Sequence, residues 1–310
     1  MRVLATVAVI GCVIGGAGAV IPAYAATTTA TPALQVGGEV SAPTTYSAAQ
    51  LAALPQVTYT VTDGGKKVTD TGVLLTTLVT DAQPAYPASV TNTKNEFLRD
   101  TVTVRSASGY AVTFALGELT ANYGNHPALL ALTSGGKPTA GGPELVVPGD
   151  RTTVRFAHRI TSVTVGVATA PVTDTAAPAN GPVDVIDGAK TVVLTRAQLA
   201  ALPQEKRTVS FSGMSGMETR TEAGPSLLDV LAAAHVKISA DTWVAASATD
   251  NYAAVVTPDE QAVGGRTLMF SLVQDGAALA RPRLVPDGDF YGDRLVSRVV
   301  DLYVGTGPAS

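Results

Sequence analysis

The chain has 310 residues, of which only 15% are charged, a formal net charge of −4 and a single cysteine, Cys12. A basic surface is the minimum requirement for binding nucleic acid, so this composition argues against a nucleic-acid partner. If the segment that holds Cys12 is removed, the mature protein has no disulfide, no cysteine nucleophile and no thiolate metal ligand.

The N-terminus predicts a secretory signal peptide over residues 1–25. Arg2 precedes an apolar run from Val3 to Ile21, and Ala23-Tyr24-Ala25 provides an A-x-A cleavage site. The alternatives are a retained membrane anchor and a lipoprotein signal at Cys12. The glycine content of the run and the early position of Cys12 favour cleavage after Ala25. We therefore expect a secreted, extracellular protein with no membrane attachment after cleavage.

Residues 26–34 are rich in Thr, Ala and Pro and predict a flexible leader. A hydroxyl three residues before Gln50 predicts a capped helix that begins at Ser47 and ends before a proline. Alternation of Val and Thr then predicts strands, which include Thr58–Thr62, Thr101–Arg105, Thr152–Phe156 and Ser162–Val167.

Residues 169–182 hold three prolines among small polar residues and predict an interdomain linker. Beyond it, Thr195 predicts a second capped helix, and a leucine stripe predicts a helix over Ser226–His235. Thr257-Pro258-Asp259-Glu260 begins a third, with proline at the first helical position. We expect Phe211–Arg220, which holds Met214 and Met217, to be a flexible apolar loop and a contact surface for a partner.

A seven-residue segment occurs twice without change, as Gln50–Gln56 and as Gln198–Gln204. Weaker sequence similarities between the two parts of the chain follow in the same order. Tyr110 and Tyr252 are each followed eight residues later by a glutamate, Glu118 and Glu260. The remaining pairs are Leu74–Leu78 with Leu227–Leu231, Leu145–Asp150 with Leu284–Asp289, and Arg159–Gly166 with Arg298–Gly305. The chain is therefore predicted to contain the same α+β, strand-rich domain twice, over residues 35–168 and 183–307.

The order of these motifs resembles the molybdopterin-binding oxidoreductase domain of the sulfite oxidase family. The first copy carries Leu-x-x-Leu-Pro at Leu51–Pro55, Gly-Tyr at Gly109-Tyr110 and Gly-Gly-Pro-x-x-Leu-Val-x-Pro-Gly-Asp at Gly141–Asp150. The second copy keeps this frame more loosely, up to Asp289 and Arg298. The resemblance implies two tandem molybdopterin-binding-like domains.

The resemblance also implies a cofactor that this chain is poorly equipped to hold. Catalytic members of the family bind molybdenum through the pterin dithiolene and one protein cysteine, and neither copy has a cysteine. The family also grips the cofactor with Arg, Lys and His, which are sparse in this frame. We therefore predict no cofactor and no catalytic residue, while the resemblance alone leaves molybdopterin as the candidate.

Six residues are candidates for lining the inherited cofactor cleft: Tyr110, Asp150, Arg155, His158, Tyr252 and Asp289. Arg151, Arg155, His158 and Arg159 follow the Pro-Gly-Asp turn on what is predicted to be a strand. Arg155 and Arg159 would share one face of it, so Arg155 and His158 would point to different faces. One interpretation of this segment is a site for an anion or the cofactor phosphate. The other is a solvated strand face with one structural arginine paired to Asp150.

Metal binding receives little support from the remaining motifs. The three histidines, His126, His158 and His235, have no metal-ligand spacing. Asp287–Arg294 has carboxylates at alternate positions but lacks the closing glutamate of a calcium loop, so an ordinary turn is the better interpretation.

Three hypotheses follow. The first is a secreted, non-catalytic binding or structural module with a degenerate metal site, acting on an unknown extracellular protein or small ligand. The second is a molybdopterin-dependent oxidoreductase with a non-cysteine site. The third is an extracellular binder of a small ligand in the inherited cleft, with Tyr110 and Tyr252 in its lining.

Overall fold

The computed structural model describes residues 33–171, 176–213 and 215–310, and these belong to one compact unit. The predicted signal peptide and most of the predicted leader lie outside the described residues, as does part of the predicted linker. Leu34, assigned to the leader by the sequence, instead begins strand β1 and is fully buried. The described residues up to 171 are called the first half below, and those from 176 onward the second half.

The first half contains two sheets and three short α-helices. One sheet has the order β2-β1-β10-β5-β6, in which β1 and β10 are parallel and the other neighbours antiparallel. The other has the order β3-β4-β7-β8, with β9 also paired to β7. The elements are β1 (Leu34–Gly38), β2 (Thr44–Tyr46), α1 (Ala48–Ala53), β3 (Val57–Asp63), β4 (Lys66–Leu74), α2 (Leu75–Ala82), the 3-10 turn η1 (Glu96–Arg99), β5 (Asp100–Ser106), β6 (Ala111–Ala115), α3 (Leu116–Leu119), β7 (Leu129–Ser134), β8 (Lys137–Pro138), β9 (Glu144–Val146) and β10 (Ile160–Val167).

The second half follows the same plan. Its five-stranded sheet has the order β12-β11-β19-β15-β16, again with the parallel pair, β11 and β19, inside it. Its second sheet has the order β13-β14-β17-β18, where the long strand β18 replaces the separate β8 and β9. The elements are β11 (Val183–Asp187), β12 (Lys190–Leu194), α4 (Arg196–Ala201), β13 (Glu205–Gly213), β14 (Gly216–Gly224), α5 (Leu227–Ala233), β15 (Thr242–Ala248), β16 (Ala253–Val256), α6 (Pro258–Ala262), β17 (Leu268–Gln274), β18 (Ala277–Pro286), η2 (Gly292–Arg294) and β19 (Val299–Thr306).

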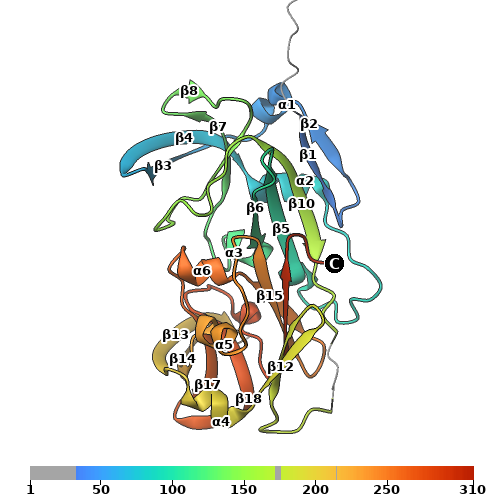
Figure 1. The fold of residues 1–310 in the computed structure, drawn as a ribbon, viewed down its shortest axis with the longest axis vertical. Helices are drawn as coiled ribbons and strands as arrows, with labels where there is room; N and C mark the ends of the chain where they lie inside the picture. Colours follow the sequence, from blue (N-terminus) through green and yellow to red (C-terminus); the bar gives the residue numbers. More distant parts are fainter. Residues whose placement is uncertain (1–32, 172–175, 214) are drawn as a thin grey trace, which may run out of the picture. The chain divides into compact units, whose positions relative to one another are not determined.

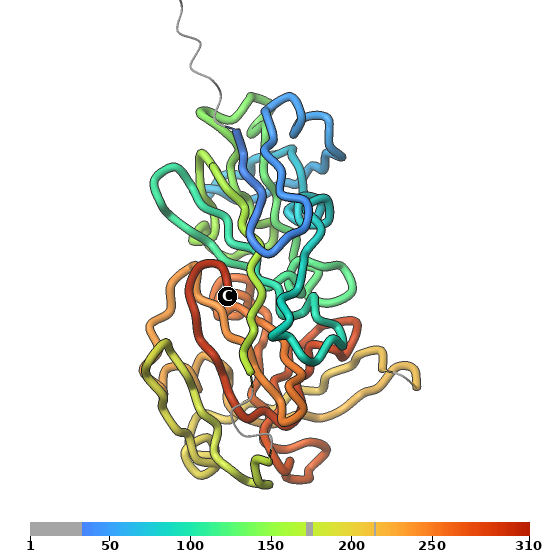
Figure 2. The backbone as a smooth tube through the Cα atoms, turned by 90° about the vertical axis from the view of Figure 1, so that its right-hand side faces the viewer, coloured from blue at the N-terminus to red at the C-terminus, as the bar shows by residue number. Residues whose placement is uncertain are grey.

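Figure 1 shows the two halves as separate groups of strands and helices, blue to green and yellow to red, and Figure 2 shows the same separation from the side. Each half has a large apolar cluster, built mainly from alternate residues of its strands and the inner faces of its helices, and the cluster of the second half also includes Leu98 and Tyr123 of the first. A smaller cluster joins the halves and consists of Ala115, Ala168, Ala170, Trp243, Ala245, Val255 and Ala309. Among the described residues, no helix has both the length and the apolar character needed to cross a membrane.

The two predicted helix caps are confirmed. Ser47 Oγ accepts a hydrogen bond from the Gln50 backbone N–H, and Gln50 Oε1 accepts one from the Ser47 backbone N–H at 2.8 Å. Thr195 and Gln198 repeat the arrangement at α4. The strands predicted around Thr58, Thr101 and Ser162 are also confirmed, as are the helices at Ser226 and Thr257.

We expect Ser47→Ala and Thr195→Ala each to lower the free energy of unfolding by about 1 kcal/mol, because each removes a hydroxyl cap from a helix N-terminus. Chemical denaturation of each variant measures this change. Thr191→Ala, at an exposed position of the edge strand β12, serves as a control with little expected effect. A cap variant as stable as the wild type would show that the capped turn adds nothing to folding.

Three sequence expectations are corrected by the structure. Thr152–Phe156 is not a strand but a series of bends and a turn, because the Arg155 side chain is drawn inward to buried carboxylates. Phe211–Arg220 is not a loop: apart from residue 214, which is not described, it belongs to the hairpin of β13 and β14, whose register is continuous. The described ends of the linker are packed rather than free, since Ala170 is buried and Tyr303 donates a hydrogen bond to the carbonyl of Pro171.

Candidate functional site

A buried cluster of charged side chains lies where the two halves meet. In the first half its centre is Arg155, which is fully buried. The Arg155 guanidinium donates to both oxygens of Asp150, at 2.9 and 2.6 Å, and to Glu118 Oε1 at 2.5 Å. All three guanidinium nitrogens are therefore paired with carboxylates, the strongest kind of hydrogen-bonded ion pair.

Short local structures bring these three residues together. Gly149, with φ of +95°, makes the turn that directs Asp150 back toward the segment holding Arg155. Glu118 lies on α3, a single helical turn directly after β6. The cluster is thus assembled from a tight turn, a loop and a single helical turn, and not from one face of a strand.

The second half holds the corresponding arrangement. Arg294 is fully buried, its Nη2 lies 2.6 Å from Glu260 Oε2, and its Nε lies 3.0 Å from Asp289 Oδ2. Each arginine follows its aspartate by five residues, and each glutamate follows a tyrosine by eight. The same residue types in the same order therefore produce the same buried contacts in both halves.

A second basic side chain reaches each aspartate. His126 Nε2 lies 3.0 Å from Asp150 Oδ1, and Arg266 Nη1 lies 3.0 Å from Asp289 Oδ1. Arg266 also donates to the carbonyl of Gly124, which belongs to the first half. The two charge clusters are thus linked across the boundary between the halves.

Further contacts across the boundary are direct. Thr257 Oγ1, at the N-terminus of α6, donates to Glu118 Oε2 at 3.2 Å. A Cβ atom at Gly117 would lie only 2.6 Å from Cδ of Arg294, so glycine allows that arginine to pack on α3. The backbone N–H of Arg151 bonds to the carbonyl of Val263 at 3.0 Å. Each half therefore supplies part of the environment of the other's arginine.

The two predicted tyrosines also have matching roles. The Tyr110 hydroxyl donates to the carbonyl of Val154 at 2.5 Å, and the Tyr252 hydroxyl donates to the carbonyl of Asp293. Each carbonyl belongs to the residue directly before a buried arginine. Both tyrosines thus hold the backbone directly before the buried arginine in place. Both hydroxyls are already hydrogen-bonded and are not free to bind a ligand.

Burial and the neighbouring opposite charges shift the pKa values of these groups in opposite directions. Burial alone would lower the pKa of Arg155, but Glu118 and Asp150 hold that pKa above its usual value. Burial raises the pKa of Asp289 to about 6, although Arg294 and Arg266 oppose the rise. At Asp150, burial is outweighed by the hydrogen bonds of Arg155 and His126, and its pKa is lowered.

The structure places the six predicted site residues in different surroundings. Asp150, Arg155 and Asp289 belong to the buried cluster, whereas Tyr110 is 43% exposed and Tyr252 half-buried. His158 has an exposed side chain, 3.1 Å from Glu144. The expectation that Arg155 and Arg159 share a face is wrong, because Arg159 is exposed with φ of +54° and the segment is not a strand.

Several members of the cluster were not predicted as site residues: Glu118, His126, Thr257, Glu260, Arg266 and Arg294. The sequence could have identified the glutamates, because each recurs eight residues after a tyrosine. It could also have identified Arg294, which follows Asp289 by five residues just as Arg155 follows Asp150. No sequence pattern identifies Thr257 or His126 as site residues, since their contacts depend on residues far away in the chain.

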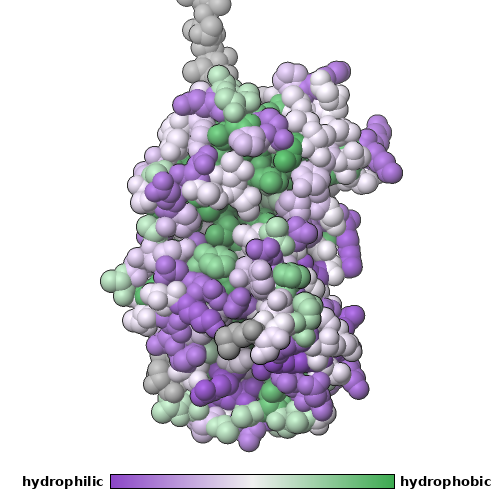
Figure 3. All heavy atoms as spheres, turned by 180° about the vertical axis from the view of Figure 1, so that it is seen from behind, coloured by the Kyte–Doolittle hydropathy of each residue, from purple (hydrophilic) through white to green (hydrophobic). Residues whose placement is uncertain are grey.

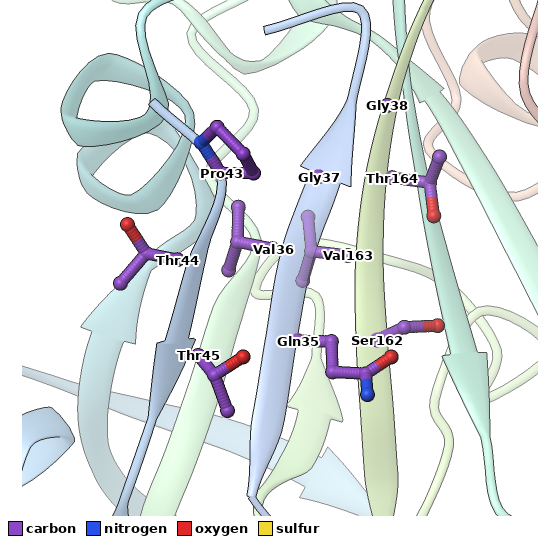
Figure 4. Close-up of a pocket in the computed structure, with 10 residues that line it drawn as sticks. All are labelled: Gln35, Val36, Gly37, Gly38, Pro43, Thr44, Thr45, Ser162, Val163 and Thr164. Carbon is purple, nitrogen blue, oxygen red and sulfur yellow. The ribbon is translucent and has the colours of Figure 1, made fainter. Parts of the chain in front are cut away.

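One pocket, about 360 Å³ in volume, lies on the strands β2, β1 and β10. Figure 4 shows its lining, which includes Gln35, Thr44, Ser162 and Thr164 but no ionisable side chain. A second pocket of about 220 Å³ includes Lys94, Asp250, Tyr252 and Asp293. Neither arginine of the buried cluster lines these pockets, so the cluster is not open to a substrate through them.

Exposed large apolar side chains are dispersed over the described residues. Met217 in the β13–β14 hairpin is 64% exposed, and Phe290 and Tyr291 form an edge-on aromatic pair with ring centroids 4.9 Å apart. Figure 3 shows one face on which apolar atoms occur in small groups between polar ones. Surfaces of this kind are common on monomeric proteins and do not by themselves mark an interface.

No protein-family model matches the sequence, and no curated protein matches it. Among solved structures, the chain is similar to the sulfane dehydrogenase SoxCD from Paracoccus pantotrophus, with a TM-score of 0.36 and 11% sequence identity. The match covers 91% of this chain and 79% of that chain. It is a distant likeness.

Proposed function

We propose that this chain is a secreted, non-catalytic binding or structural module made of two tandem molybdopterin-binding-like domains of the sulfite oxidase type. One observation carries the proposal. The polar residues that recur in both halves, including Arg155 with Arg294 and Glu118 with Glu260, are buried and bonded to one another. Residues retained for chemistry would be expected to face an accessible cleft instead.

The residues present do not fit the cofactor that the sequence resemblance implies. Cys12 is the only cysteine, and it lies in the predicted signal peptide, outside the described residues. Arg155, a candidate for holding the cofactor phosphate, has all of its nitrogens bonded to carboxylates. The described residues therefore offer neither the thiolate nor a free arginine at the predicted positions.

We expect protein purified from the culture medium to contain no molybdenum and to lack pterin absorbance, even when molybdate is supplied. Metal analysis and an absorbance spectrum measure this directly. Molybdenum at close to one atom per chain would contradict the proposal and favour the oxidoreductase with a non-cysteine site.

A further inference from the structure

An acidic pocket of about 110 Å³ lies in the first half, between the β3-β4-β7 sheet and the loop that ends at His158. Its lining includes Asp63, Asp70 and Glu144 together with His158, but no lysine or arginine. Glu144 is already within 3.1 Å of His158. The pocket thus concentrates negative charge without a permanent positive charge in its wall.

Asp70 is the decisive residue of this pocket. It lies on β4, its exposed fraction is only 3%, and it lines the pocket. Its Oδ1 atom is buried without a hydrogen-bond partner. A buried carboxylate in this state is unfavourable unless a donor or a cation reaches it.

The second half shows how the same position is satisfied there. Glu222 on β14 is fully buried, as Asp70 nearly is. Arg283 Nη1 lies 3.0 Å from Glu222 Oε1, and Ser271 Oγ donates to Glu222 Oε2 at 2.6 Å. Arg283 Nε also donates to Ser297 Oγ at 2.9 Å.

The strand register sets the correspondence. Gly72 and Gly224, each two residues after the acid, approach the carbonyls of Leu130 and Phe270 in the same way. Leu130 pairs with Leu145, and Phe270 pairs with Leu284. The register therefore pairs Asp70 with Glu222, Glu144 with Arg283 and Ala131 with Ser271. The sequence correspondence of Arg159 with Arg298 pairs His158 with Ser297.

At these positions the first half has Glu144 where the second has Arg283, and Ala131 where the second has Ser271, and both halves have a buried acid. Both differences remove donors, and one adds a second negative charge. Lys66, the cross-strand neighbour of Asp63, is exposed and does not line the pocket. An external cation is the simplest group that would neutralise the buried carboxylate of Asp70, as Arg283 neutralises Glu222 in the second half.

We propose that this pocket binds an organic cation through a guanidinium group, held by Asp70 and Glu144 in the position that the Arg283 guanidinium takes in the second half. Val68, Leu145 and Phe156 provide an apolar wall for the rest of the ligand. A metal ion is less suited, because no group of three or more His, Cys, Asp or Glu side chains within the described ranges could hold one. The site deepens the proposed binding role and rests on it.

The test is titration with methylguanidinium, followed by calorimetry and by the melting temperature. Saturable binding with a rise in melting temperature is expected. Acetyl-arginine amide forms a second arm: its binding shows that the pocket accepts an arginine side chain, whereas binding of methylguanidinium alone restricts the site to small free cations. Absence of methylguanidinium binding, or stronger binding of Ca²⁺, overturns the proposal.

Three variants make the test specific. Asp70→Asn should weaken binding by about tenfold or more, because it removes the charge that pairs with the ligand. Glu144→Arg copies Arg283, so it should abolish binding and raise the melting temperature without ligand. Asp187→Asn, at an exposed strand end in the second half, should bind like the wild type.

Unchanged affinity in both Asp70→Asn and Glu144→Arg would overturn the site. That failure would leave the non-catalytic proposal intact, since molybdenum content tests that proposal independently.

Discussion

Replacement of Arg155 with methionine is expected to lower the free energy of unfolding by about 3–5 kcal/mol, the usual cost of removing one partner from a buried ion pair. Methionine fills much of the same volume, so the loss comes mainly from charge. Glu118 and Asp150 would remain buried next to each other without their shared cation. Because α3 also contacts Arg294, both halves should be weakened together.

Chemical denaturation followed by fluorescence measures this effect, with Arg207→Met as the matched control. Arg207 pairs with Glu205 on the surface at 3.2 Å, where Arg207 is exposed and Glu205 partly exposed. Such a pair contributes about 0–1 kcal/mol, so the control should be nearly as stable as the wild type. Equal stability of the two variants would show that the buried cluster does not hold the fold together.

The protein is expected to become less stable as the pH rises from about 4 to about 8, chiefly because of Asp100 at the start of β5. Asp100 is fully buried and accepts a hydrogen bond from the Tyr86 hydroxyl at 3.1 Å. Burial raises its pKa to about 8, with the Tyr86 bond opposing the rise and Glu96 adding to it. In the unfolded chain an aspartate ionises near pH 3.9.

The direction of the effect follows from these two pKa values. Between them the unfolded state has released the proton of Asp100 while the folded state still binds it, so the stability present at low pH is lost as the pH rises. The loss is on the order of a few kcal/mol, at about 1.4 kcal/mol per unit. Asp289, with its pKa raised to about 6, acts in the same direction over the lower part of this range.

Asp150 acts in the opposite direction and in a different range. Its pKa is lowered by Arg155 and His126 despite its burial, so its contribution is present at neutral pH and is lost only as the pH falls below about 4. We therefore expect maximum stability at mildly acidic pH.

Unfolding free energies at pH 4.5, 6 and 8 test this expectation. Asp100→Asn mimics the protonated carboxyl, so it should flatten most of the slope and stabilise the protein at pH 8. Asp187→Asn, which is exposed, should keep the wild-type slope. A steep slope that persists in Asp100→Asn would assign the effect to other groups.

Local sequence patterns predicted the capped helices and three of the four named strands, at Thr58–Thr62, Thr101–Arg105 and Ser162–Val167. The hydroxyl and glutamine at Ser47 and Gln50 bond to backbone groups within one turn, so nothing outside that turn is needed to recognise them. The prediction of a strand at Thr152–Phe156 was wrong because a contact with a distant residue decides the structure there. Its alternation was overridden by Arg155, whose partner Glu118 is 37 residues away.

The candidate site was only partly visible in the sequence. Recurrent spacing singled out Asp150, Asp289 and both tyrosines, because the same contacts recur in both halves. The acidic pocket at Asp70 was missed altogether. Its meaning depends on the register of β7 with β9 and of β17 with β18, which shows that Glu144 stands where Arg283 does.

By itself, the sequence determined the strand-rich character, the helix ends and the repeated order of motifs, because these follow from interactions between near neighbours and from hydrophobic periodicity. Only the tertiary structure decided what the repeated polar residues do. The contact between Thr257 and Glu118 spans 139 residues, and whether such side chains face solvent or each other depends on how the halves pack. Burial then converts these charges from candidate ligands of a cofactor into partners of one another.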